Sequence, residues 1–150
     1  MSNADTIFAV SSGSGRAGIA IIRVSGRACG EVLGGLLGSM PAARQVSYRK
    51  LNDPETGELI DKGLVLWLPG PSTATGEDMA ELHVHGSAAV IDCVLAALSR
   101  LPGLRAAEAG EFSRRAFRNG KMDLVEAEGL ADLLAAEGDA ALEFLRHTEG

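Results

Sequence analysis

The feature that most limits the possible folds is a run of five apolar residues, Leu64-Val65-Leu66-Trp67-Leu68. As a strand it would be apolar on both faces, so it is expected in the interior of a β-sheet that is covered on each side. A dense turn signal, Asn52-Asp53-Pro54-Glu55-Thr56-Gly57, lies between residues 46–51 and 59–68. This arrangement predicts a β-hairpin whose second arm contains the apolar run.

The other segments predict an α+β domain around that hairpin. Short β-branched or alternating runs are expected to form further strands at 6–10, 19–24, 81–85 and 104–107. Two amphipathic helices are expected at 25–38, capped by Ser25, and at 87–101, which Pro102-Gly103 ends. The first would bury an apolar face made of Ala28, Val32, Leu33, Leu36 and Leu37. The prediction is a mixed sheet of five or six strands with both helices packed on it.

Composition and charge exclude several classes of protein. The 150 residues suit about one domain, and 14 Lys and Arg against 20 Asp and Glu give a net charge of −6. The chain as a whole would repel a nucleic-acid backbone, so such contacts must be local or made by another part of the protein. No apolar run is long enough to span a membrane, and no secretion signal is present. Cys29 and Cys93 are predicted to be small buried hydrophobes in a reducing cytoplasm, not a disulfide or a metal site.

A glycine-rich loop follows the first predicted strand. Gly13, Gly15 and Gly18 spell the G-x-G-x-x-G pattern of dinucleotide-binding loops, which must open a helix to hold a pyrophosphate. The β-branched run that follows, residues 19–24, predicts a strand instead. A nicotinamide site is therefore disfavoured, and a flexible loop between two strands is the simpler interpretation.

Two of the predicted strands carry candidate functional residues. Arg23 lies in an otherwise apolar run, where an unpaired charge is costly, so an anionic partner or ligand should lie nearby. Strict alternation at 81–85 places Glu81, His83 and His85 on one face and buries the residues between them. His-x-His is a known metal-ligand spacing, but no third ligand completes the set. A polar strand face that lines a cleft is the preferred interpretation.

The stretch from Gly110 to Leu134 is predicted to form two helices. In the first, Phe112, Ala116 and Phe117 would face the core, and the arginines largely lie opposite: Arg114, Arg115 and Arg118. Asn119-Gly120 would end this helix and place Lys121 on the turn. This cluster of cations indicates a nearby anion.

Asp123, with Glu126 three residues later, is expected to cap a second, long helix. That helix would leave the core, because the apolar residues near its end have little to pack against. The sequence therefore suggests a first domain over 1–122 and the beginning of a truncated helical domain over 123–150.

The combination of motifs resembles the N-terminal domain of the MnmE (TrmE) family of tRNA-modification GTPases. The resemblance extends from the first residues to Leu134, and the run from Gly110 is its most specific part. The motifs that carry it are Asp5-Thr6-Ile7, Gly15-Arg16-Ala17-Gly18-Ile19, Arg23-Val24-Ser25-Gly26, Pro69-Gly70-Pro71, Thr75-Gly76-Glu77-Asp78, Glu81-Leu82, His85-Gly86, Gly110-Glu111-Phe112-Ser113, Asn119-Gly120-Lys121-Met122-Asp123-Leu124 and Ala127-Glu128.

The resemblance implies a fold similar to the tetrahydrofolate-binding fold of one-carbon enzymes. It implies that this domain binds 5-formyltetrahydrofolate, or a related one-carbon folate, through positions that match Arg23, Glu81 and Lys121, and that it forms a homodimer. In the whole protein, the folate would supply a one-carbon unit for 5-carboxymethylaminomethyl-type modification of the wobble uridine in tRNA, together with the flavoprotein MnmG.

The enzymatic part implied by the resemblance lies outside this chain. The sequence contains no G-x-x-x-x-G-K-[ST] loop, so GTP, Mg²⁺ and K⁺ would be bound by a GTP-binding domain that is not present here. The full-length protein would be a GTPase, and this chain alone is not expected to be catalytic or to bind a metal ion.

Two alternatives stay open at the level of the sequence. One is a stand-alone folate protein related to the aminomethyltransferases. The other is a dimerisation module without folate binding, which the departures from the family pattern at Ala17 and Ala74 would fit.

Overall fold

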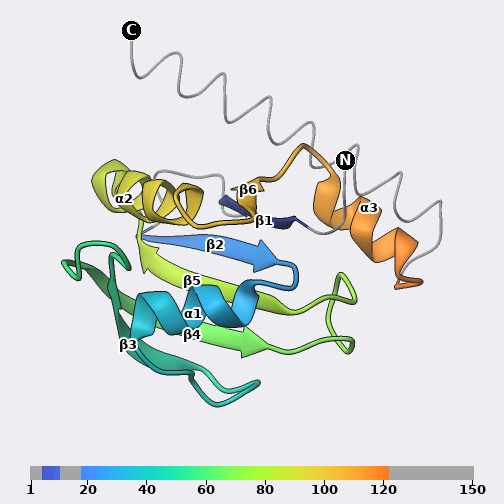
Figure 1. The fold of residues 1–150 in the computed structure, drawn as a ribbon, viewed down its shortest axis with the longest axis horizontal. Coiled ribbons are helices and arrows are strands. Elements are labelled where there is room, and N and C mark those ends of the chain that lie inside the picture. The colour runs from blue at the N-terminus through green and yellow to red at the C-terminus, as the bar shows by residue number, and fades with distance from the viewer. Residues whose placement is uncertain (1–4, 11–17, 122–150) are drawn as a thin grey trace, which may run out of the picture.

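The computed structural model describes residues 5–10 and 18–121. Six strands form one sheet in the order β3-β4-β5-β2-β1-β6 (Figure 1). Their bounds are β1 Thr6–Val10, β2 Ile19–Ser25, β3 Ser47–Asn52, β4 Leu59–Leu68, β5 Met79–His85 and β6 Leu104–Ala106. All neighbouring strands are antiparallel except β1 and β6. The described residues therefore form the predicted mixed sheet.

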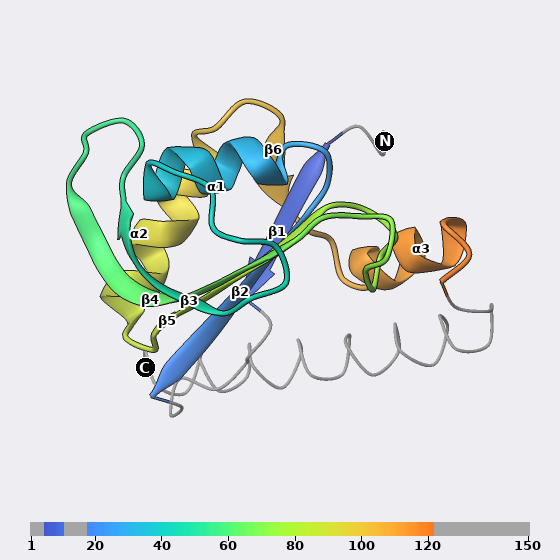
Figure 2. The same cartoon turned by 90° about the horizontal axis from the view of Figure 1, so that it is seen from below.

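Three helices accompany this sheet: α1 Cys29–Leu37, α2 Ala88–Ser99 and α3 Glu111–Arg118. The buried residues of α1, and Val94 and Leu98 of α2, belong to the same core cluster as Ile22, Val65 and Leu82, which share one face of the sheet. Figure 2 shows both helices on one side of the sheet and α3 on the other. The result is an α+β domain, as predicted.

The prediction that the apolar run would be covered on both sides is wrong. Val65 is fully buried under the helices, but Leu64 on the opposite face is 38% exposed, and Leu66 and Leu68 are half-buried. The physical reason is that α1 and α2 both pack on one face, while α3, among the described helices, lies at the distant end of the other. In the part of the chain that the structure describes, the middle of that second face carries no helix (Figure 2).

Several local predictions are confirmed. The β3–β4 hairpin forms as expected, although Val46 lies just outside β3 and is exposed. Ser87 caps α2 by accepting a hydrogen bond from the backbone N–H of Val90. The glycine-rich segment joins two antiparallel neighbours, β1 and β2, as expected, and the element that follows it is a strand; Gly13 and Gly15 themselves lie outside the described residues.

The predicted start of α1 is wrong. Ser25 ends β2, and the helix begins four residues later at Cys29. The Ser25 hydroxyl is fully buried and bonded to Thr75 and Glu77, so it is not available as a cap. Instead, the Thr6 hydroxyl accepts a hydrogen bond from the Ala28 N–H at 2.9 Å.

The two cysteines have different environments, and the prediction that both are buried is confirmed only for Cys29. Cys29 replaces the expected Ala28 on the buried face of α1, whereas Cys93 on α2 is exposed, so only Cys29 is a buried hydrophobe. Burial raises the pKa of the Cys29 thiol to about 12. No described helix is both long and apolar enough to cross a membrane.

Candidate functional site

Three polar side chains meet on the face of the sheet that the first two helices leave uncovered. Arg23 on β2 and Glu81 on β5 are directly opposite each other in the antiparallel ladder. Arg23 Nε and Nη2 both donate to Glu81 Oε2, at 3.2 and 2.9 Å. His83 Nε2 lies 3.0 Å from the other oxygen, Oε1. The predicted polar strand face is confirmed, and the anionic partner expected for Arg23 is Glu81.

These contacts determine the charge of Glu81. Partial burial by itself would raise the pKa of this carboxyl, but the hydrogen bonds from His83 and Arg23 outweigh burial and hold the pKa below its ordinary value. Glu81 is therefore an ionised acceptor near neutral pH. Because an ionised carboxylate only accepts hydrogen bonds, the hydrogen in the contact with His83 lies on the imidazole Nε2.

Apolar side chains flank this polar group. On β4, Leu66 and Leu64 are the register partners of Glu81 and His83, and on β1 Ala9 is the partner of Arg23. A strand partner on an antiparallel sheet projects from the same face, so the charged atoms lie between half-buried or exposed aliphatic groups. This arrangement suits a flat, partly apolar ligand whose edge donates hydrogen bonds.

The alternative metal site receives no support from the described residues. His85 lies on the expected face, but its ring Nδ1 bonds Asp61 at 2.9 Å rather than turning toward His83. No group of three or more potential metal-binding side chains occurs in the part of the chain that the structure describes.

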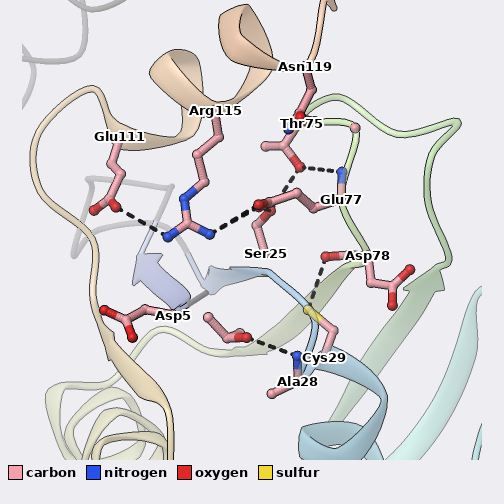
Figure 3. A network of polar contacts seen from close by, with 12 residues as sticks. Asp5, Ser25, Ala28, Cys29, Thr75, Glu77, Asp78, Glu111, Arg115 and Asn119 are labelled. Atoms are coloured by element: carbon pink, nitrogen blue, oxygen red, sulfur yellow. Dashed lines mark hydrogen bonds and ion pairs between the residues drawn. The ribbon is translucent and has the colours of Figure 1, made fainter. Parts of the chain in front are cut away.

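A second polar cluster lies at the Ser25 end of the same face (Figure 3). Arg115 on α3 is 1% exposed, and its Nη1 donates to both carboxylate oxygens of Glu77, at 3.1 and 3.3 Å. Ser25 also donates to Glu77, at 2.7 Å. Asn119, at the end of α3, donates to the Thr75 carbonyl at 2.8 Å. These bonds fix α3 against the loop of residues 72–78.

The predicted orientation of α3 is therefore wrong in part. Arg115 and Glu111 face the core, whereas Phe117 is 40% exposed. The anion that this cationic helix meets is supplied by the protein itself, since Glu77 and Glu111 both bond Arg115. A buried guanidinium without a partner would cost much free energy, and the two carboxylates that pair with Arg115 offset this cost.

Glu111 is the second anchor of α3. Arg105 Nη1 and Nη2 bond its two oxygens at 2.8 and 2.6 Å. The hydrogen bond from Arg105 is the main reason that the pKa of Glu111 falls to about 2. The helix is thus held by ion pairs at its beginning and by the bond from Asn119 at its end.

Lys121 lies just beyond α3 and beside the same loop. Its backbone N–H bonds the Ala116 carbonyl at 2.8 Å, and its side chain is exposed. A Cβ atom placed on Gly76 would lie 3.4 Å from Lys121 Cε, so the lysine stem passes close to Gly76. The structure brings Arg23 and Glu81 together but shows no direct bond from either to Lys121. Asp123 and the predicted second helix lie outside the described residues.

Sequence reasoning missed the parts played by three residues. The alternation places His83 beside Glu81 on one strand face, but it does not predict the bond between the two side chains. Glu77 and Arg115 are 38 positions apart, and nothing in their local sequence links them. They pair because the tertiary structure packs α3 against the loop of residues 72–78.

Comparison with known proteins identifies the family. Residues 6–121 match the family described as "GTP-binding protein TrmE N-terminus". A tRNA modification GTPase MnmE of Methylorubrum populi is 58% identical over 147 residues, which cover 97% of this chain and 33% of the relative. The MnmE of Rhizorhabdus wittichii is 62% identical over 141 residues, covering 93% and 32%.

A human relative has a more specific name. The mitochondrial 5-taurinomethyluridine-[tRNA] synthase subunit GTPB3 of Homo sapiens is 57% identical over 148 residues, covering 97% of this chain and 30% of the relative. The chain thus spans about a third of the length of the curated relatives it matches. With a match over residues 6–121 and this identity to the MnmE proteins, the chain belongs to the TrmE N-terminus family.

Proposed function

We propose that this chain is the folate-binding part of a protein that modifies tRNA. It binds 5-formyltetrahydrofolate, or a related one-carbon folate, through Glu81, Arg23 and Lys121. The observation that supports this most is the ionised Glu81 carboxylate, held by Arg23 and His83 on an aliphatic-flanked face of the sheet that α1 and α2 do not cover. A pterin ring is flat, and its aminopyrimidine edge carries two adjacent N–H donors that a carboxylate can accept together.

Arg23 and Lys121 bind different groups of the folate in this proposal. Arg23 donates to the carbonyl oxygen of the pterin, next to the edge that Glu81 binds. The exposed Lys121 ammonium meets a carboxylate of the folate tail. The loop of residues 72–78 and α3 hold Lys121 at the end of the site, through the bonds from Arg115 to Glu77 and from Asn119 to Thr75.

The proposal for the whole protein extends the names of its relatives. Those names refer to tRNA modification by a GTPase and to 5-taurinomethyluridine synthesis. In our proposal the folate supplies the one-carbon unit for 5-carboxymethylaminomethyl-type modification of the wobble uridine. GTP, Mg²⁺, K⁺, tRNA and the flavoprotein MnmG bind outside this chain. Family membership favours this proposal over a stand-alone aminomethyltransferase.

Location and assembly belong to the same proposal. Both cysteines among the described residues are free, which suits a cytoplasmic protein.

A homodimer is supported by exposed apolar side chains on and beside the edge strand β3, where Val46 is 65% and Tyr48 67% exposed. A dimer that did not bind folate would correspond to the second alternative, so folate binding is the property to test first.

The test is calorimetric titration of the 150-residue chain with 5-formyltetrahydrofolate. Glu81→Gln keeps the size of the side chain but replaces one acceptor with a donor. We expect affinity to fall by about 10- to 100-fold, since a hydrogen bond to a charged group contributes about 1.5–3 kcal/mol. Lys121→Ala should weaken binding as well. Glu58→Gln, on the exposed hairpin turn, removes the same charge far along the sheet and should have no effect.

A competition arm makes the assignment specific. Guanine presents the same pair of N–H donors as a pterin, so GTP is added to the chain before the folate. No competition is expected if the site is built for folate. Failure of the unsubstituted chain to bind 5-formyltetrahydrofolate, or equal affinity of the Glu81→Gln variant, would overturn the proposal.

A further inference from the structure

The hydrogen-bond capacity of Glu81 limits how many donors of a ligand its carboxylate can accept. An ionised carboxylate offers about four acceptor positions, two on each oxygen. Arg23 fills both positions on Oε2 with its Nε and Nη2 donors, and His83 fills one on Oε1. A ligand edge with two adjacent donors needs one position on each oxygen. Oε1 has a free position, but Oε2 has none until one protein donor leaves.

Arg23 is the donor that can leave. Its Nε bond is the longest of the three, at 3.2 Å, and its side chain is 37% exposed. Arg23 also retains a second donor on the same oxygen after Nε departs. A guanidinium has five donors in a planar fork, so it can keep one bond to the carboxylate while another reaches an acceptor on the ligand.

His83 is held more firmly. Its side chain is 27% exposed, less than that of Arg23, and its Nε2 lies 3.0 Å from Oε1 of Glu81. Its backbone is tightly packed against β4, since a Cβ atom placed on Gly63 would lie only 2.1 Å from the His83 carbonyl oxygen. This close approach anchors β5 at the position from which the imidazole projects.

We propose that His83 is the positioning residue of the folate site, because its Nε2–H holds Oε1 of Glu81 while Arg23 releases part of Oε2 to the ligand. This inference rests on the proposed function and adds a residue to it. His83 orients the carboxylate plane before the ligand arrives, so less conformational freedom is lost on binding. Arg23 is the adaptable member of the group and His83 the fixed one.

Two substitutions separate this role from simple packing. His83→Gln retains an amide N–H donor with similar reach, whereas His83→Leu has comparable bulk and no donor. We expect His83→Leu to bind 5-formyltetrahydrofolate about tenfold more weakly, the loss typical of one charge-assisted hydrogen bond. His83→Gln should bind within about threefold of the unsubstituted chain, because it restores that bond. Circular dichroism and thermal unfolding are recorded for both variants.

A spectroscopic measurement follows the donors directly. In nitrogen-15 NMR spectra of the unsubstituted chain, the Arg23 Nε–H resonance should move on saturation with the folate. The His83 Nε2–H resonance should stay that of a hydrogen-bonded imidazole. This NMR measurement uses the unsubstituted chain alone, so its result does not depend on the stability of any variant.

The outcomes distinguish the inference from the function on which it rests. If the unsubstituted chain does not bind the folate, the proposed function fails. If it binds and Glu81→Gln weakens binding, but a folded His83→Leu variant binds as tightly as the unsubstituted chain, only the role of His83 is overturned. A folded His83→Gln variant that loses binding, or a His83 resonance that shifts while that of Arg23 does not, also overturns it.

Discussion

At the scale of single residues, Arg115 shows how a charge can belong to the core. Its guanidinium is 1% exposed and bonds Glu77 and Glu111, although its Nε has no partner among the described residues. A buried ion pair is weak evidence of net stabilisation, but removing one member leaves the other unpaired. The arginine therefore fixes the position of α3, and its loss would leave two carboxylates without a partner.

Replacing Arg115 with methionine should be strongly destabilising. The change leaves Glu77 and Glu111 without one partner each, and breaking a buried pair in this way costs about 3–5 kcal/mol. Urea unfolding followed by circular dichroism measures the effect. Arg114→Met is the matched control, because the neighbouring Arg114 pairs with Glu108 at the surface, where such a pair contributes about 0–1 kcal/mol. Equal losses in the two variants would contradict this account.

At the scale of elements, the loop of residues 72–78 and α3 act as one unit. Gly76 adopts φ +83°, and a Cβ atom at this position would lie 2.7 Å from Asn119 Cβ and 3.4 Å from Lys121 Cε. No larger residue fits here without moving the end of α3. The conformation and the space at Gly76 thus set the position of a predicted folate contact 45 residues later in the chain.

Gly76→Ala should therefore weaken folate binding as well as stability. A left-handed backbone conformation costs a non-glycine residue about 1–3 kcal/mol, and the clash with Asn119 adds to this. Gly57→Ala is a suitable control, since Gly57 has φ +77° but no atom within 4 Å of an added Cβ. It should lose stability from strain alone and bind 5-formyltetrahydrofolate normally. Calorimetry and urea unfolding of both variants test the comparison, and unchanged affinity in Gly76→Ala would separate Lys121 from the site.

At the scale of the whole molecule, the sheet is covered unevenly. One face lies under α1 and α2, and among the described helices only α3 covers the other, at the Ser25 end (Figure 2). The same open face carries the candidate folate site in its middle and, toward the β3 edge, the neighbouring pair Tyr48 and Leu64. Exposed apolar side chains on an edge strand favour association with another chain.

A second copy of this chain is the partner expected at that edge. Tyr48→Asp places a charge on the exposed edge and should shift a dimer toward monomer by at least about tenfold in dissociation constant. Sedimentation equilibrium measures this. Ile19→Asp, which alters an apolar residue on β2 that is 53% exposed, should leave association unchanged. A monomeric unsubstituted chain, or equal effects of both substitutions, would contradict the proposed interface.

The strands and helices were largely predictable because local pattern determines them. Alternation along 81–85 placed Glu81 and His83 on one face, and β-branched composition after the glycine loop identified β2 correctly. The turn at 52–57 marked the hairpin. Errors occurred where a residue had a distant partner: Ser25 bonds Thr75 and Glu77, so it could not cap α1, and Arg115 finds its carboxylates on the core side of α3.

The sequence by itself determined the identity of the elements, the family to which the chain belongs, and the candidate residues Arg23, Glu81 and Lys121. Only the tertiary structure decided that α1 and α2 share one face of the sheet, that His83 bonds Glu81, and how Lys121 is placed beside Gly76. The physical reason is the sequence separation of the interacting residues. Periodicity, turns and caps depend on neighbours a few residues apart, whereas these contacts depend on how α1, α2 and α3 divide the two faces of the sheet.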